Sequence, residues 1–281
     1  MMRGVASSVM EEAGDWVSID TSVPNVARIY DYWLGGKDNF AADREAADRS
    51  AEAVPQLPWL SRENRKFLGR AVRFCARAGI TQFLDIGSGL PAKENVHEVA
   101  GQAVGEPHVV YVDSDPVVVT HARALLCTAR TAAARGDLTQ PEQILQAPEV
   151  RRLIDFGRPV AILVAATLHF IPDEAGPAAA MARLRDAMAL GSYLVISHVE
   201  VSPGHGAGTQ PRSQTALDLG EAQKGTPWGP ARTRKEIAAF FGDLALVEPG
   251  LVDVWDWRPD SDVTAASSDV LTVLGGVARK D

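Results

Sequence analysis

The sequence predicts an α/β protein built around a mainly parallel sheet, and three observations lead to this fold class. Short apolar runs alternate with segments whose apolar residues recur at helical spacing, as crossover connections require. The run at residues 80–86 ends in a turn with two glycines and leads into a helical pattern. Near the C-terminus, residues 244–252 and 271–279 read as strands with no long helix between them, so we expect them to pair antiparallel.

Length, charge and cysteine content narrow the class of protein. A chain of 281 residues that is 46% hydrophobic can bury the core of one large domain. A net charge of −8 argues against a nucleic-acid or anionic-membrane partner. Cys75 and Cys127 lack the spacing of a zinc site or a disulfide framework, so we expect no metal. No apolar run has transmembrane length, and the acidic N-terminal region is unlike a signal peptide, so we expect a cytoplasmic protein.

The first part of the chain is expected to form a helical addition to this domain. Small and polar residues at 1–22 indicate a mobile tail, residues 23–78 a helical lid, and residues 79–281 the main domain. Gly35-Gly36 should end the first helix, and Asp38 or Asn39 should cap the second. Within the lid, helices are expected at residues 25–34, 38–53 and 59–78.

The segment 30–40 is dense in aromatic residues, glycines and polar groups. Aromatic residues at such spacing often belong to a core, so a packing role stays open beside a role as a binding loop. Under the second interpretation, the candidate cofactor contacts in this segment are Tyr30, Gly35 and Lys37. The candidate substrate contacts are Tyr32, Asn39 and Phe40.

The glycine turn follows the first predicted strand, and two kinds of ligand compete for it. Gly87 and Gly89 can adopt positive φ and let a ligand approach the backbone closely. A pyrophosphate site needs a third small residue for helix packing, and here Ala92 stands in that place after a rigid proline. Asp85 at the strand end instead suits a cationic ligand such as S-adenosylmethionine, although it could also cap its own turn.

Two further acids follow the next predicted strands. Asp113 ends the strand 108–112 and lies 24 residues after Gly89, the distance at which an acid meets a ribose. A helix N-cap, the other use of an acid here, fits Asp115 better. Asp137 ends a short strand that starts at residue 131, where it could accept a hydrogen bond from an adenine amine while the next residue, Leu138, covers the ring.

The most apolar run, residues 159–166, is the predicted central strand, and a loop with a histidine follows it. His169 lies there at the carboxyl edge of the sheet, and His198 ends the next strand near the same edge. Either imidazole is a candidate catalytic base, and a purely structural role for each stays open. The Gly- and Pro-rich residues 202–208 and a helix at 212–224 could close over the pocket.

Taken in order, these motifs resemble the class I S-adenosylmethionine-dependent methyltransferases. The segment 30–40, with Asp43-Arg44, looks like the signature of a bacterial S-adenosyl methyltransferase family. In that family the signature precedes a glycine motif that ends in Leu-Pro, here Leu90-Pro91, and an Asn-x-His, here Asn95 and His97. The resemblance covers roughly residues 23–279.

The resemblance implies a Rossmann-like, seven-stranded methyltransferase sheet whose last strand is antiparallel, and S-adenosyl-L-methionine as cofactor. It assigns Asp85 to the amino-acid end, Asp113 to the ribose, and Asp137 with Leu138 to the adenine. Ala92 and Ser114 stand where relatives would have Thr and Asn. In the main domain, the expected cofactor contacts are Asp85, Gly87, Ser88, Gly89, Asp113, Ser114, Asp137, Leu138 and Ala165.

The expected activity is methyl transfer to a small-molecule acceptor. His169 is expected to contact that acceptor, and His169 or His198 would act as base only where the acceptor must lose a proton. Two alternatives stay open. A regulatory protein could bind S-adenosylmethionine without catalysis, and an NAD-dependent oxidoreductase is disfavoured by Ala92 and the C-terminal strand pair.

Overall fold

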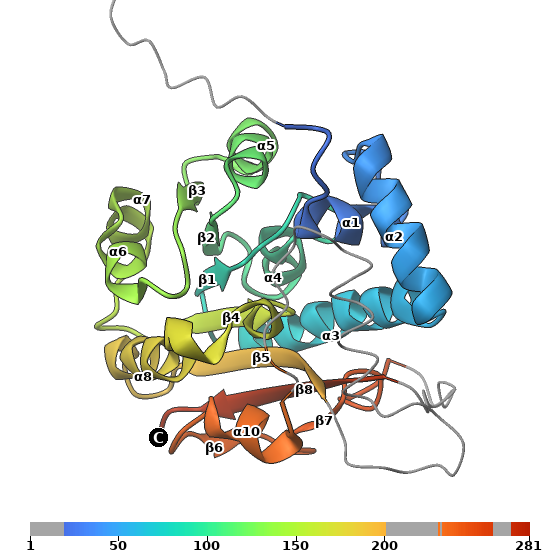
Figure 1. The fold of residues 1–281 in the computed structure, drawn as a ribbon. Helices are drawn as coiled ribbons and strands as arrows, with labels where there is room; N and C mark the ends of the chain where they lie inside the picture. The colour runs from blue at the N-terminus through green and yellow to red at the C-terminus, as the bar shows by residue number, and fades with distance from the viewer. Residues whose placement is uncertain (1–19, 201–229, 231, 261–270) are drawn as a thin grey trace, which may run out of the picture.

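The structure is a computed structural model that describes residues 20–200, 230, 232–260 and 271–281 (Figure 1). Most of the predicted N-terminal tail, the loop predicted at 202–208 and the helix predicted at 212–224 lie outside these residues. The helices of the first half of the chain are α1 (Val26–Trp33), α2 (Ala41–Ala53), α3 (Leu57–Arg77), α4 (Val96–Val104) and α5 (Pro116–Leu126). Those of the second half are α6 (Pro141–Gln146), α7 (Pro148–Leu153), α8 (Pro177–Ala187) and α10 (Arg234–Ala239), with short 3₁₀ turns η1 (Leu168–Phe170) and η2 (Asp173–Ala175).

One mixed sheet runs through the molecule in the order β3-β2-β1-β4-β5-β8-β6, and β7 also pairs with β8. The strands β1 to β5 are mutually parallel, and β8 is antiparallel to β5 along eight residue pairs. This arrangement confirms the predicted Rossmann-like sheet with an antiparallel C-terminal strand. The strands are β1 (Gln82–Ile86), β2 (His108–Asp113), β3 (Thr131–Arg135), β4 (Ala161–Ala165), β5 (Tyr193–Glu200), β6 (Ala245–Leu246), β7 (Val252–Asp253) and β8 (Thr272–Arg279).

The predicted strand at 244–252 differs in detail, because it forms two short pieces and brings the sheet to eight strands where seven were expected. Both pieces pair with the same edge of β8, Ala245 opposite Arg279 and Val252 opposite Gly275. The chain turns away between them at Pro249-Gly250, where proline has no N–H to donate to a ladder.

Helices cover both faces of the sheet, since side chains alternate between the faces along each buried strand. In β1, Phe83 belongs to the core cluster formed with α3, α4 and α5. Its neighbours Leu84 and Ile86 belong to the opposite cluster, formed with α6, α7 and α8. Figure 1 shows this three-layer arrangement, with α6, α7 and α8 on one side and α3 and α4 on the other.

The N-terminal helices α1 and α2 pack on each other through Ile29, Ala46 and Ala47. In Figure 1, α2 lies at the right-hand edge of the molecule, with α1 between it and the sheet. Gly35, with a φ of +81°, follows α1 as its C-terminal glycine, as predicted. The predicted cap of α2 is wrong, because Phe40 is its N-cap residue and Asp43 accepts the backbone N–H of Phe40 at 2.8 Å.

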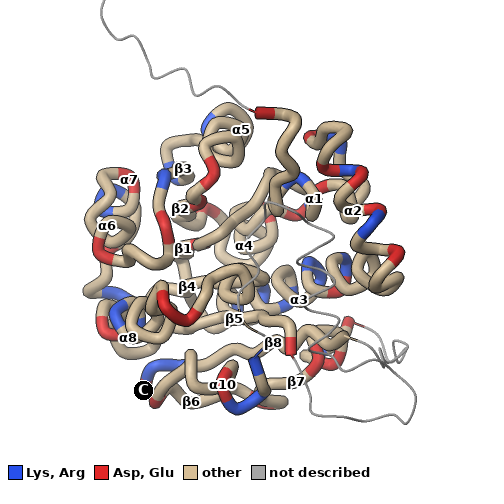
Figure 2. The backbone as a smooth tube through the Cα atoms, in the orientation of Figure 1, with Lys and Arg blue, Asp and Glu red and all other residues tan. Residues whose placement is uncertain are grey.

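The described surface carries both signs of charge, and Figure 2 shows acidic and basic residues alternating along α2. Within the described ranges, none of the helices combines the length and apolar character needed to cross a membrane. The same residues contain no group of three or more His, Cys, Asp or Glu side chains placed to hold a metal ion.

Candidate functional site

A cavity of about 550 Å³ lies at the carboxyl ends of β1, β2, β3 and β4, where open α/β sheets bind ligands. The turns after these four strands form its floor, and residues of α1 and α3 form a wall. Its size is in the range of cofactor and small-molecule sites. The N-terminal helices therefore border the same cavity as the strand-end acids.

The turn after β1 requires glycine at its first position. Gly87 has a φ of +73°, and its N–H donates to Val112 O at 2.8 Å. A Cβ at Gly87 would lie 2.2 Å from Thr167 Oγ1, and that hydroxyl donates to Ala165 O at 3.1 Å. Gly89 also has positive φ, but a Cβ there would have no atom within 4 Å. The side chain of Thr167, in the loop after β4, thus lies closer to Gly87 than any side chain at position 87 would allow.

Asp85 is the buried acid of the cavity, with only 3% of its surface exposed. Burial raises the pKa of its carboxyl to about 7, while the positive charge of Arg65 acts in the opposite direction. Arg65 also lines the cavity and donates to Glu94 O at 3.0 Å. Because desolvation disfavours the ionised form, a cationic group in the cavity would stabilise the charged carboxylate. The site therefore favours a ligand with a positive charge near Asp85.

Asp113 lies at the end of β2 and supports the glycine turn. Its Oδ2 accepts the Gly89 N–H at 3.0 Å, and its Oδ1 accepts the Asp115 N–H at 3.0 Å. Burial raises the pKa of this carboxyl, and these backbone donors oppose the shift. Each carboxylate oxygen can accept a second hydrogen bond. Asp113 can therefore take two ligand hydroxyls without losing its own backbone bonds.

The third acid, Asp137, closes the turn after β3. It accepts the N–H and the hydroxyl of Thr139, each at 2.8 Å, through the same oxygen, Oδ1. Leu138 lines the cavity and is 4% exposed. The remaining carboxylate oxygen and the apolar side chain beside it provide a hydrogen-bond acceptor and an apolar contact for a ligand ring.

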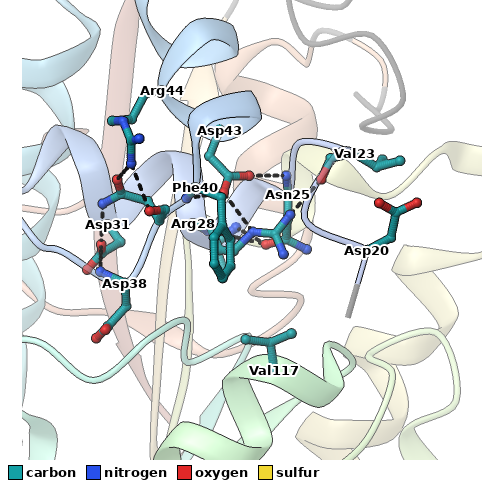
Figure 3. A network of polar contacts seen from close by, with 12 residues as sticks. Asp20, Val23, Asn25, Arg28, Asp31, Asp38, Phe40, Asp43, Arg44 and Val117 are labelled. Atoms are coloured by element: carbon teal, nitrogen blue, oxygen red, sulfur yellow. Dashed lines mark hydrogen bonds and ion pairs between the residues drawn. The ribbon is translucent and has the colours of Figure 1, made fainter. Parts of the chain in front are cut away.

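The wall formed by α1 is attached to this floor by a polar network, drawn in Figure 3. Asn25 caps α1 by accepting the Ala27 N–H at 2.8 Å, and its amide nitrogen donates to Asp115 Oδ2. Asp115 in turn caps α5 by accepting the Val117 N–H at 2.7 Å. The first turn of α1 is thereby fixed to the loop after β2, directly at the cavity.

A buried ion pair completes the network. Arg28 Nε lies 2.9 Å from Asp43 Oδ2, with both side chains almost fully buried. The other oxygen of Asp43 accepts the Asn25 N–H at 2.9 Å, and the Arg28 guanidinium stacks over the Phe40 ring at 5.3 Å. Figure 3 shows these side chains converging between α1 and the start of α2. The ion pair connects α2 to the helix that borders the cavity.

The family model and the similar solved structures both indicate a methyltransferase. The family model described as S-adenosyl methyltransferase matches residues 12–281. The chain belongs to this family. Its cofactor is S-adenosyl-L-methionine, and the cationic ligand favoured by Asp85 agrees with the ammonium group of that molecule.

Similar solved structures agree with the assignment of this S-adenosyl methyltransferase. A candidate methyltransferase of Thermobifida fusca YX is 44% identical, with a TM-score of 0.84 over 97% of this chain and 99% of that chain. A protein of the DUF574 family from Streptomyces avermitilis MA-4680 is 40% identical, with a TM-score of 0.84 over 93% and 99%. The plantazolicin methyltransferase BamL shares the fold alone, at 11% identity and a TM-score of 0.53 over 90% and 95%. A search of curated proteins found no match.

Most of the predicted cofactor contacts of this S-adenosyl methyltransferase meet at the cavity. Those that line it are Tyr30, Asp85, Gly87, Ser88, Gly89, Asp113, Ser114, Asp137, Leu138 and Ala165. Gly35 and Lys37 do not line it, and both are exposed. The turn after α1 carries these two residues away from the carboxyl edge of the sheet.

The predicted substrate contacts of the N-terminal segment also lie outside the cavity. Tyr32 lies 3.3 Å from Asp48 through its hydroxyl, and Phe40 packs under Arg28. Asn39 donates to the buried Asp31 at 2.8 Å. All three contacts lie within α1, α2 and the connection between them.

His198 has no access to the cavity, because it is fully buried in β5 and both ring nitrogens are engaged. Arg232 Nη1 lies 3.0 Å from Nε2, and Nδ1 lies 2.6 Å from Val199 O. A guanidinium can only donate, so Nε2 accepts and Nδ1 carries the proton. Burial, with a smaller contribution from Arg232, lowers the pKa of His198 to about 4. The predicted role as a base therefore has no structural support.

His169 lies on the wall of a smaller side chamber next to the cavity. Burial is the main cause that holds the pKa of this imidazole well below its ordinary value, and the nearby His198 and Arg232 add to the effect. The ring is therefore neutral at pH 7. In that state it adds no charge to the wall of the chamber.

Arg232 was not recognised from the sequence, although it fixes the loop after β4. Its guanidinium donates to Leu168 O and Ile171 O, each at 2.8 Å, and to Asp173 at 2.7 Å. Nothing in the local sequence distinguishes it from surface arginines. Asn25, Asn64 and Arg65 were missed as well, although an amide within the apolar stripe of α3 is a signal that could have indicated Asn64.

Replacing Arg232 with methionine should lower the free energy of unfolding by about 3 kcal/mol or more, because it leaves buried carbonyl oxygens without donors. Urea unfolding measures this change. Arg183→Met is the matched control. Its ion pair with Glu142 is exposed, and we expect less than about 1 kcal/mol. Equal losses in the two variants would show that Arg232 does not support the loop.

Proposed function

We propose that this protein transfers the methyl group of S-adenosyl-L-methionine to a small-molecule acceptor bound beside the cofactor cavity. The observation that carries the proposal is the meeting of three strand-end acids and a glycine turn around one cavity of about 550 Å³. Asp85 would face the ammonium group, Asp113 the ribose hydroxyls, and Asp137 with Leu138 the adenine. The burial of Asp85 and the free acceptor capacity of Asp113 support these roles.

The same features disfavour a pyrophosphate in this cavity. Two partly or fully buried acids, Asp85 and Asp113, would repel its negative charge. The next helix, α4, begins only at Val96, and Asn95 and Glu98 already form a capping box at its start. A dinucleotide fold instead places the pyrophosphate at a helix N-terminus directly after the glycines.

The reaction asks little of the protein beyond positioning. The bound cofactor supplies an activated methyl group, which an acceptor lone pair attacks in line while the carbon–sulfur bonding electrons return to sulfur. Any proton lost by the acceptor can then go to water. Holding two reactants at near-attack distance can account for a large part of such a rate enhancement. The turn at Gly87, the three acids and the wall of α1 would perform this positioning.

We also propose that the segment 30–40, apart from Tyr30 and Trp33, acts through α1 and not through direct ligand contacts. Only Tyr30 of this segment lines the cavity. Its hydroxyl donates to Ser61 O at 2.8 Å and accepts from Asn64 Nδ2 at 2.9 Å, which attaches α1 to α3. Burial raises the pKa of this phenol, so it remains protonated and keeps both bonds at neutral pH. The remainder of the segment would hold α1 in place.

Calorimetric titration with S-adenosylmethionine, S-adenosylhomocysteine and NAD tests the proposal. We expect both adenosyl compounds to bind in the micromolar range and NAD to give no signal. Mass spectrometry of a mixture of candidate acceptors, incubated with labelled cofactor, would then identify the methylated product. Absence of binding by both adenosyl compounds would reject the proposed function.

The shift at Asp85 predicts a pH dependence of ligand binding. An ammonium group bound beside Asp85 favours the ionised carboxylate, so binding below about pH 7 must release a proton. Affinity for S-adenosylhomocysteine should therefore rise with pH up to about pH 7, by at most roughly tenfold per pH unit, and then level off. Calorimetry in two buffers of different ionisation enthalpy measures the released proton.

The unliganded protein should show the opposite trend in stability. The folded-state pKa of Asp85 is raised from 3.8 to about 7, so between these values the folded state holds the proton more tightly than the unfolded state. Asp85 therefore contributes a free energy of unfolding that falls as the pH rises through this range. Asp85→Asn should remove both dependences. An unchanged pH profile in that variant would assign them to another group.

A further inference from the structure

A side chamber of about 50 Å³ opens beside the cofactor cavity, between α1, α3 and the loop after β4. The chamber and the cavity share five lining residues, which form the passage between them: Val26, Tyr30, Asn64, Ala166 and Phe170. The chamber is too small for a complete drug-sized ligand. It can take one end of a molecule whose remainder lies in the passage.

The wall of the chamber is neutral and mostly apolar. Side chains such as Ile29, Leu57, Leu60 and Val273 form most of it, and no Asp, Glu, Lys or Arg belongs to the described lining. The imidazole of His169 is neutral because of its burial. A charged group placed here would lose its hydration without an ionic partner, at a large cost. The chamber therefore selects a neutral group.

Among the described residues, the wall holds two buried polar atoms with unused hydrogen-bonding capacity, Asn64 Oδ1 and Trp33 Nε1, and of these two residues Asn64 alone also lines the cofactor cavity. Asn64 is 5% exposed, and its Oδ1 is buried with no hydrogen-bond partner in the described structure. The amide orientation is fixed, because Nδ2 donates to the Tyr30 hydroxyl, whose own proton goes to Ser61 O. An unsatisfied buried acceptor is costly, which makes a donor from a ligand favourable at this position.

We propose that this chamber is the acceptor subsite and that it receives the neutral, apolar or aromatic end of the acceptor, with one hydrogen-bond donor of the ligand directed to Asn64 Oδ1. This inference rests on the proposed methyltransferase function and names the class of its substrate. Asn64 lies on the border of both spaces, so a group held there is next to the cofactor cavity. The lining chemistry excludes a carboxylate or an ammonium at this end of the acceptor.

Three small aromatic probes test the inference on protein saturated with S-adenosylhomocysteine. Phenol is neutral with one donor, toluene has no polar atom, and benzoate is charged. Methyl NMR reports binding through the signals of Leu57 and Leu60, which line the chamber and not the cavity. We expect phenol to shift these signals and to bind more tightly than toluene, with no shift from benzoate.

Two variants, with one control, test whether the probes bind in the chamber. Asn64→Leu should weaken phenol about tenfold, the worth of one buried hydrogen bond, and change toluene less. Val199→Phe, at the half-buried chamber residue of β5, should abolish binding of both probes by filling the space while affinity for S-adenosylhomocysteine stays within about twofold. Leu190→Phe adds the same ring at an exposed position and should change nothing.

The outcomes separate this inference from the proposed function. If S-adenosylhomocysteine binds but phenol shifts neither leucine signal, the subsite is rejected and the cofactor site stands. Equal phenol affinity in the parent protein and the Val199→Phe variant would also reject it, and so would benzoate binding as tightly as phenol. If S-adenosylhomocysteine itself does not bind, the proposed function and the subsite both fail.

Discussion

Replacing Asp113 with alanine should weaken S-adenosylhomocysteine binding roughly a hundredfold, which corresponds to about 3 kcal/mol. The proposed ribose contact places two hydroxyl donors on one charged carboxylate, and hydrogen bonds to charged groups are the stronger kind. The same carboxylate also accepts the N–H groups of Gly89 and Asp115, so the turn that approaches the ligand loses its support as well. Calorimetry on the purified variant measures the change.

Two comparisons separate the ribose contact from a general loss of structure. Adenosine and 2′,3′-dideoxyadenosine should differ in affinity for the parent protein and bind equally to Asp113→Ala, because only the parent recognises the hydroxyls. Asp186→Asn, a change of an exposed acid on α8 that does not line the cavity, should leave both affinities unchanged. A hydroxyl preference that persists in Asp113→Ala would assign the ribose to another residue.

Replacing Gly87 with alanine should lower the free energy of unfolding by about 2–5 kcal/mol and abolish cofactor binding. A φ of +73° is unfavourable for any residue with a Cβ, and that Cβ would lie 2.2 Å from Thr167 Oγ1 and 2.6 Å from its Cγ2. The turn or the loop after β4 must therefore move, and both form the cavity. Urea unfolding and calorimetry measure the two effects.

Gly89 provides the matched control, because it has a φ of +66° and open space where a Cβ would lie. Gly89→Ala should lose only the backbone contribution, about 1–2 kcal/mol. Thr167→Ala combined with Gly87→Ala should recover part of the stability, since it removes both clashing atoms. If the Gly87 and Gly89 variants lose equal stability, contact with Thr167 is not what requires glycine at position 87.

The strand-end part of the site could be predicted because each residue there is fixed by its own strand. Asp85, Asp113 and Asp137 lie within two residues of a strand's last residue, and parallel strands bring their carboxyl ends to one edge whatever the details of packing. Gly87 directly follows β1, so the turn has little freedom in where it meets the cavity. The predicted antiparallel position of the last strand followed from a missing crossover helix, which is also a local property of the chain.

The N-terminal segment could not be resolved in the same way. Tyr30, Gly35 and Lys37 lie within eight residues, but only the side chain on the inner surface of α1 reaches the cavity. Which surface is inward depends on how α1 packs against α2 and α3. The surroundings of His198 could not be predicted for a related reason. This histidine lies near the carboxyl edge of the sheet, yet Arg232, 34 residues away in sequence, donates to its Nε2 at 3.0 Å.

The sequence by itself indicated the mainly parallel sheet, its antiparallel C-terminal strand and the acids near the strand ends, because strand and turn patterns act over a few residues. The tertiary structure alone decided which face of α1 meets the cavity, that Arg232 donates a hydrogen bond to the His198 ring, and that Asn64 keeps a buried oxygen without a partner. These features arise from contacts between segments distant along the chain. The energies of these contacts depend on the relative positions and the burial of the two segments, and a local residue pattern determines neither.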